Sequence, residues 1–223
     1  YLVFIVVFVR FVMKRFYLSV LFLCSFGSLF AGGPSFAFCD YSQGKVFIQE
    51  NGEIVWEHKA PDSNDIWVLP NKNILFTAGE EVLEVSRKND TIFHYTSESN
   101  IFACQRLKNG NTFIGECDNG RLLEVSPDGS IVKDVSILPF GVKTGGHAFM
   151  RNARCLDNGY NLVAHYGGKS VVEYDENGKA VWNIPVPGGA HSVIRLPSGN
   201  TLVAVTDKDN NPGVFEYDMA GNI

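Results

Sequence analysis

Short runs of alternating apolar and polar residues fill the chain beyond residue 38, and turn-forming residues separate these runs. Residues 193–196 and 201–205 are an example, because β-branched residues dominate both runs and Pro-Ser-Gly-Asn lies between them. A two-residue alternation predicts half-buried strands, and glycine and asparagine favour the positive φ angles of tight hairpin turns. The pattern therefore predicts antiparallel hairpins, and no helical periodicity accompanies it.

Two short motifs recur along this pattern at nearly constant intervals. The first is Leu-x-x-Gly-Asn-Thr or a worn variant of it, and it begins at Leu69, Leu107, Leu156 and Leu196. The second joins a strand to another turn, and it begins at Glu84, Glu124, Glu173 and Glu216. Successive leucines are 38, 49 and 40 residues apart, and successive glutamates 40, 49 and 43. Two hairpins per repeat make a four-stranded unit, and about 40–45 residues is the size of one β-propeller blade.

The repeat predicts an all-β protein, a β-propeller with four-stranded antiparallel blades. Four copies of each motif predict about four blades, out of six to eight in a complete ring. In the copy of the second motif that begins at Glu173, the turn glycine Gly178 is followed by a further strand that contains Trp182. After the corresponding Gly221 only two residues remain, too few for that strand. We therefore expect residues 38–223 to form an incomplete propeller, part of a longer protein.

The first 37 residues follow a different pattern, a long apolar stretch with three basic residues between positions 10 and 15. Basic residues ahead of an apolar run are typical of a secretory signal. We expect residues 13–37 to be a signal peptide, cleaved after Ala37 or after Ala31, and residues 1–12 to be translated upstream sequence. The alternative is an uncleaved membrane anchor, since the stretch is long enough to span a bilayer. The predicted location is secreted or periplasmic.

Composition removes several function classes. The net charge of −5 argues against nonspecific nucleic-acid binding, which needs a basic surface. No Cys-x-x-Cys or His-x-x-x-His spacing occurs, so neither a metal site nor a cofactor is expected. Cys104 and Cys117 flank one predicted hairpin, and strand register decides between a disulfide and two small buried side chains.

Two longer stretches resemble a known group of proteins. Glu-Tyr-Asp-x-x-Gly-x-x-Val-Trp begins at Glu173, and His-Ser-x-x-Arg-Leu-Pro-x-Gly-Asn-Thr-Leu begins at His191. Together they resemble exported bacterial propellers of the PQQ-like and arylsulfotransferase-like group, over residues 39–223. The resemblance implies two enzymatic alternatives, sulfuryl transfer through a histidine and PQQ-type oxidation. PQQ-type oxidation ranks last, because Asp175 and Gly178 are closer in sequence than in the quinoprotein repeat.

Propellers bind ligands at the mouth of the central channel, on segments that lead into the inner strands. Here these segments precede the motif leucines, and five residues before each leucine stand Asn64, Phe102, Arg151 and His191. Different residue types at equivalent positions are expected if these residues line a ring-shaped binding site. They are equally expected if the loops have diverged without a function. With their neighbours, the predicted ligand-binding residues are Asn64, Asp65, Phe102, Arg151, Asn152, His191 and Ser192.

Two histidines are the candidate catalytic residues, His191 and His147, because imidazole titrates near neutral pH. In a sulfuryl transfer one of them would accept the sulfuryl group while an arginine held the anion. Three further arginines lie inside predicted strands, where we expect pairing with a neighbouring blade's glutamate; these are Arg106, Arg154 and Arg195.

The favoured function is a binding scaffold, with a small molecule, a glycan or a protein as ligand at the channel mouth. Enzymatic activity is left open, with the arylsulfotransferase-like reaction as the alternative and PQQ-type oxidation third. A membrane contact is expected only if the N-terminal segment is retained as an anchor.

Overall fold

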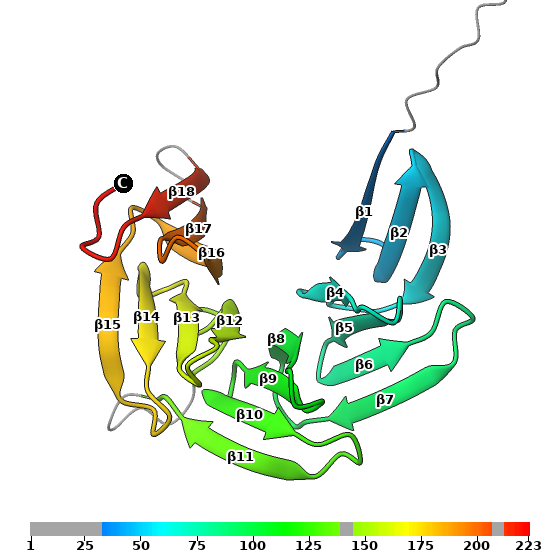
Figure 1. Ribbon diagram of the computed structural model, residues 1–223, viewed down its shortest axis with the longest axis horizontal. Coiled ribbons are helices and arrows are strands. Elements are labelled where there is room, and N and C mark those ends of the chain that lie inside the picture. Colours follow the sequence, from blue (N-terminus) through cyan, green and yellow to red (C-terminus); the bar gives the residue numbers. More distant parts are fainter. Residues whose placement is uncertain (1–32, 139–144, 207–211) are drawn as a thin grey trace, which may run out of the picture. The chain divides into compact units, whose positions relative to one another are not determined.

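The computed structural model describes residues 33–138, 145–206 and 212–223, and every regular element in these ranges is a β-strand. The strands form five antiparallel sheets, in each of which strands that follow one another in sequence are neighbours (Figure 1). Within these ranges there is no helix with the length and apolar character needed to cross a membrane.

The five sheets follow one another along the chain. The first consists of β1 (Gly33–Asp40), β2 (Lys45–Asn51) and β3 (Glu53–Lys59). The second consists of β4 (Ile66–Val68), β5 (Ile74–Ala78), β6 (Glu81–Val85) and β7 (Thr91–Thr96). The third consists of β8 (Ile101–Arg106), β9 (Thr112–Glu116), β10 (Arg121–Val125) and β11 (Ile131–Ser136). The fourth consists of β12 (Asn152–Cys155), β13 (Asn161–His165), β14 (Ser170–Tyr174) and β15 (Ala180–Pro185). The fifth consists of β16 (Gly189–Arg195), β17 (Thr201–Thr206) and β18 (Gly213–Tyr217).

The all-β propeller architecture is confirmed, but the expected blade count is wrong. The structure has five blades of three or four strands, not an incomplete set of about four. The Leu motif marks the turn between the first two strands of a blade, and the first sheet has no such turn. Its three strands correspond to the last three elsewhere, because Ala60 donates its amide to Gly44 as Ile137 does to Gly120. Counting Leu motifs therefore missed this sheet.

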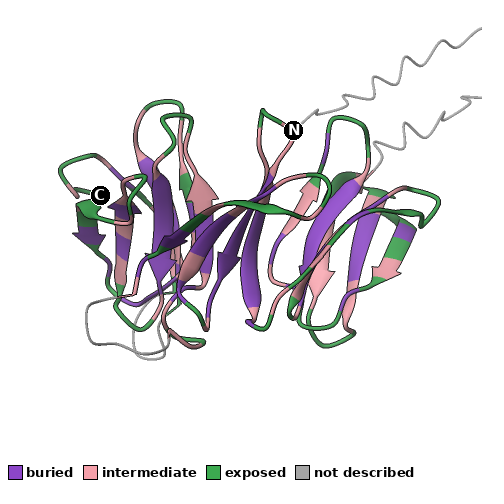
Figure 2. Cartoon of the chain, turned by 90° about the horizontal axis from the view of Figure 1, so that it is seen from below, coloured by how far each residue is buried: buried purple, intermediate pink, exposed green. Residues whose placement is uncertain are grey.

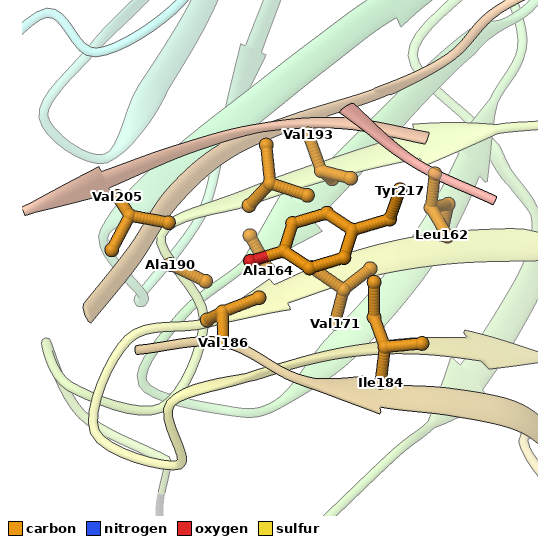
Figure 3. Close-up of a cluster of buried hydrophobic side chains, with 10 residues drawn as sticks. Leu162, Ala164, Val171, Ile184, Val186, Ala190, Val193, Val205 and Tyr217 are labelled. Carbon is orange, nitrogen blue, oxygen red and sulfur yellow. The ribbon is translucent and has the colours of Figure 1, made fainter. Parts of the chain in front are cut away.

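Apolar side chains fill the space between consecutive sheets. Figure 2 shows that buried residues lie mainly in the strands and exposed residues in the turns. Between the fourth and fifth sheets, the ring of Tyr217 lies at the centre of an aliphatic cluster (Figure 3). Around it are Leu162, Ala164, Val171, Ile184, Val186, Ala190, Val193, Val203 and Val205. Burial of each large side chain contributes about 1.5–3 kcal/mol. Because this stabilisation comes from the space between the sheets, residues at the strand ends can vary without loss of the core.

The first strand overlaps the predicted signal peptide. β1 begins at Gly33, so cleavage after Ala37 would remove most of this strand. Cleavage after Ala31 would leave β1 whole. Residues 1–12, and the signal as far as residue 32, lie outside the described residues, and export stays a prediction.

Cys104 and Cys117, for which the sequence left a disulfide open, do not form one. Cys104 lies opposite Ile114 in the β8–β9 register, and Cys117 comes after β9 has ended. Both are free thiols, and burial raises the pKa of Cys117 to about 11. The Cys117 thiol is therefore protonated at neutral pH, and it donates to the carbonyl of Gly146.

Candidate functional site

The four positions that precede the motif leucines by five residues meet around Arg151. This residue stands immediately before β12, where its amide donates to the carbonyl of Ala164. Its Nη2 donates to Oδ1 of Asn64 at 3.3 Å and to Nε2 of His191 at 3.0 Å. The guanidinium carbon lies 4.6 Å from the centre of the Phe102 ring, a cation–π distance. We call Arg151, Asn64, Phe102, His191 and His147 the Arg151 cluster.

His147 joins this cluster through its ring. Nη1 of Arg151 lies 3.2 Å from Nδ1 and 3.3 Å from Nε2 of His147. The lone pairs of the two ring nitrogens point in different directions, so one N–H cannot align with both. The His147 ring also lies edge-on to Phe102, with centroids 5.5 Å apart. Both histidines thus contact the same guanidinium.

The charge of Arg151 is not neutralised within the described residues. Five other arginines in those ranges form ion pairs with a carboxylate, but Arg151 forms none. Burial lowers the pKa of Arg151, and its buried Nε has no hydrogen-bond partner. A half-buried cation with an unpaired N–H is unfavourable, and an anion would satisfy both its charge and its donor.

The Arg151 cluster favours the neutral form of its two histidines. Burial and then the positive charge of Arg151 lower the pKa of both His147 and His191. Because Nε2 of His191 accepts a hydrogen bond from Arg151, its ring proton is assigned to Nδ1. The cluster therefore presents one fixed positive charge beside two imidazole rings that resist protonation.

Stability is expected to decrease as the pH falls below 6.5. Burial also lowers the pKa of His165, so three histidines have folded-state pKa values below the ordinary histidine value of about 6.5. Between those values and 6.5 the unfolded chain binds more protons than the folded one, which favours unfolding. Urea denaturation at about pH 7.5 and about pH 5.5 measures the effect. An unchanged free energy of unfolding would contradict it.

Two of the predicted ligand-binding residues face the interior. Both carboxylate oxygens of Asp65 accept hydrogen bonds from Arg154, at 2.6 and 2.9 Å, and one also accepts the amide of Cys104. Burial raises the pKa of Asp65, and the charge of Arg154 opposes the rise. Oδ1 of Asn152 accepts the amide of Val193. Asp65 and Asn152 thus tie inner strands together, outside the Arg151 cluster.

The arginines inside the strands are largely as predicted. Arg106 binds Glu84 and Arg195 binds Glu173, each at 2.6 Å and each across two neighbouring sheets. These pairings are confirmed. Arg154 differs, because its partner is Asp65 rather than a glutamate of the second motif. Ser192 is half-buried, and none of the hydrogen bonds found for the described side chains involves its hydroxyl.

Two tyrosines near the cluster are not among the residues predicted from the sequence. Tyr166 follows β13, and its ring lies edge-on to His191 with centroids 6.5 Å apart. A Cβ on Gly189 would lie 2.4 Å from the Tyr166 ring, so only glycine permits this packing. Tyr41 follows β1, and a hydrogen bond to Asp62 raises its pKa while the charge of Arg151 opposes the rise. In a full blade, the turn between the second and third strands lies at the end of the sheet where the first, inner strand begins. Both tyrosines occupy such turns, and this position in the repeat could have identified them from the sequence.

No protein-family model matches the chain, and no curated protein matches it. Among solved structures, a protein of unknown function from Bacteroides caccae has a TM-score of 0.69 and 20% identity, over 82% of this chain and 72% of that one. Streptogramin B lyase has a TM-score of 0.57 and 16% identity, over 83% of this chain and 65% of the lyase. Virginiamycin B lyase from Staphylococcus aureus has a TM-score of 0.58 and 15% identity, over 86% and 68%. At these identities the likeness shows the β-propeller fold alone.

Proposed function

We propose that this chain binds a small molecule with an anionic group at the Arg151 cluster. The observation that carries the proposal is the half-buried guanidinium of Arg151, to which the described part of the chain provides neither a carboxylate partner nor an acceptor for Nε. A carboxylate, sulfate or phosphate would supply the missing charge and accept a charge-assisted hydrogen bond from the guanidinium. The ring of Tyr166, which lies edge-on to His191, adds aromatic surface at the cluster, whereas Phe102 is only 6% exposed. These features favour a small aromatic anion over an uncharged glycan or a protein.

The test is a calorimetric titration with 2-naphthoate, with 4-nitrophenyl sulfate and with PQQ. We expect at least one anion to bind, and the variant Arg151→Gln to bind it at least about tenfold more weakly, because a hydrogen bond to a charged group is worth about 1.5–3 kcal/mol. Arg87→Gln is the matched control, since it removes an arginine that is paired with Glu50 on the surface. Failure of all three anions to bind, or equal affinity in Arg151→Gln, would reject the proposal.

The contact between His191 and Arg151 favours one enzymatic alternative, sulfuryl transfer from an aryl sulfate. A neutral imidazole is the nucleophilic form, and Arg151 would hold the sulfate oxygens. Nε2 of His191 would give up its hydrogen bond from Arg151 and attack sulfur as the bond from sulfur to the aryl oxygen breaks, and the aryl oxide would leave with the electron pair. An acceptor hydroxyl would then take the sulfuryl group and lose its proton to solvent.

This alternative is tested by the release of 4-nitrophenolate from 4-nitrophenyl sulfate in the presence of a phenol acceptor. Release that is lost in His191→Ala, with an unchanged unfolding midpoint, would support it. No release by the wild-type chain would eliminate it and leave ligand binding as the proposal. PQQ-type oxidation has no feature of the Arg151 cluster in its favour.

A further inference from the structure

A second set of equivalent positions lies at the opposite end of the same inner strands. Two residues before the motif leucines stand Trp67, Gln105, Arg154 and Ile194. These side chains come from β4, β8, β12 and β16, and all four line one cavity of about 410 Å³. Arg151 stands before the start of β12 and Arg154 near its end, so this cavity and the Arg151 cluster occupy opposite ends of the strand. We call it the Trp67 cavity.

The Trp67 cavity is lined by two guanidinium groups and by the carboxylate of Asp157, which pairs with Lys108 at 2.8 Å on the surface. Arg154 is bonded to both oxygens of Asp65, and its guanidinium carbon lies 5.0 Å from the centre of the Trp67 ring. Arg195, which also lines the cavity, binds Glu173 at 2.6 Å. Because both cations already have carboxylate partners, the cavity does not call for an anion. In this respect it is the reverse of the Arg151 cluster.

The remaining walls are mainly apolar. The ring of Trp67 and the side chain of Ile194 contribute, with further surface from Leu156, Leu196 and Pro197. Ile194 is 44% exposed, an apolar side chain that a ligand would remove from water. Small-molecule sites commonly have volumes of about 300–1,000 Å³ and a few polar groups among apolar ones. The Trp67 cavity has this volume and this composition.

Gln105 provides a positioned hydrogen-bond donor. Its Oε1 accepts the amide of Cys155 at 3.0 Å, and its Nε2 donates to the carbonyl of Cys155 at 3.2 Å. An amide nitrogen carries two hydrogens, and this pair of bonds uses one of them. The second hydrogen of Nε2 is held in a fixed direction by the same pair of bonds. A ligand oxygen in the cavity could accept it.

We propose that the Trp67 cavity is a second binding site, for an uncharged aromatic molecule that carries a hydrogen-bond acceptor. The ring of the ligand packs against Trp67 and Ile194, and its acceptor oxygen receives the free N–H of Gln105. This site shares no residue with the Arg151 cluster, so it does not depend on anion binding there. The two ends of the inner strands thus select ligands of opposite character, one anionic and one neutral.

The experiment follows Trp67 directly in the full chain, labelled with 5-fluorotryptophan. The chain has three tryptophans, and the ¹⁹F resonance of Trp67 is assigned from Trp67→Phe. We expect 2-naphthol, a neutral probe, to shift the Trp67 resonance saturably. We also expect Ile194→Lys to weaken this binding at least about tenfold, because a lysine would place an unpaired charge in the cavity. Val132→Lys is the matched control, since Val132 is 56% exposed on β11 and lies outside the cavity.

Two results would overturn the proposal. One is a Trp67 shift that does not saturate, or that survives Ile194→Lys, because neither fits a defined site. The other is the absence of any shift with 2-naphthol, which would leave the cavity to another class of partner. Arg151→Gln keeps these outcomes separate from the anion proposal. It should weaken binding of whichever anion the chain binds and leave the response to 2-naphthol unchanged.

Discussion

Replacement of Asp65 by asparagine is expected to lower the free energy of unfolding by about 3–5 kcal/mol. The side chains of Asp65 and Arg154 are only 7% and 13% exposed, and two hydrogen bonds join them. Asparagine has nearly the same shape as aspartate, so packing is kept while the guanidinium loses its negative partner. A buried cation without a partner is costly, and urea denaturation of the variant at neutral pH measures that cost.

The surface pair Lys108–Asp157 is the matched control for Asp65→Asn. Both of its side chains are 86% exposed, so water replaces the lost partner and Asp157→Asn should leave the unfolding midpoint unchanged. The double variant Asp65→Asn with Arg154→Met should regain much of the lost stability, because it removes the stranded charge as well. If Asp65→Asn were no more damaging than Asp157→Asn, the buried pair would not have the importance assigned to it.

Replacement of Gly178 by alanine is expected to destabilise the protein by about 2–4 kcal/mol. Gly178 has a φ of +80°, in a region that residues with a Cβ rarely occupy. In addition, a Cβ there would lie 2.5 Å from the carbonyl oxygen of Ser136 in the third sheet. That oxygen belongs to the backbone, so the two sheets would have to separate slightly. Thermal or urea denaturation of the variant gives the measurement.

Gly129 separates these two causes. It occupies the equivalent turn of the third sheet, with a φ of +88°, but a Cβ on it would meet no atom within 4 Å. Gly129→Ala therefore carries the backbone cost alone, about 1 kcal/mol. Equal losses in Gly129→Ala and Gly178→Ala would show that the contact between the third and fourth sheets contributes nothing to the effect.

The repeating part of the fold could be predicted from sequence because hairpin turns have strict chemical requirements. Asn109 and Gly110, for example, occupy a turn in which Gly110 has a φ of +90°. The first sheet could not be counted in this way, since it lacks the strand that leads into the Leu motif. The number of sequence motifs therefore underestimates the number of blades when one blade lacks the motif.

The candidate site was only partly predictable for a different reason. Asn64 and Asp65 are adjacent polar residues, yet Asn64 reaches Arg151 and Asp65 is buried against Arg154. Strict alternation from the motif leucine also fails for Phe102 and His191, because register shifts interrupt β8 between Ile101 and Ala103 and β16 between Ala190 and Ser192. The partner of Arg154 depends on how the second and fourth sheets meet, and no local pattern contains that information.

The order of strands along the chain also determines when these features arise during synthesis. Each sheet is made of consecutive strands, but its apolar side chains pack against the next sheet, so it is stabilised only once the following segment has also left the ribosome. The bonds of Arg151 with Asn64 and of Arg154 with Asp65 join residues 87 and 89 positions apart, and such long loops close late. A nascent chain that ends in the third sheet can hold folded blades but contains neither Arg151 nor Arg154. The Arg151 cluster is therefore completed only after its four contributing segments have all been synthesised.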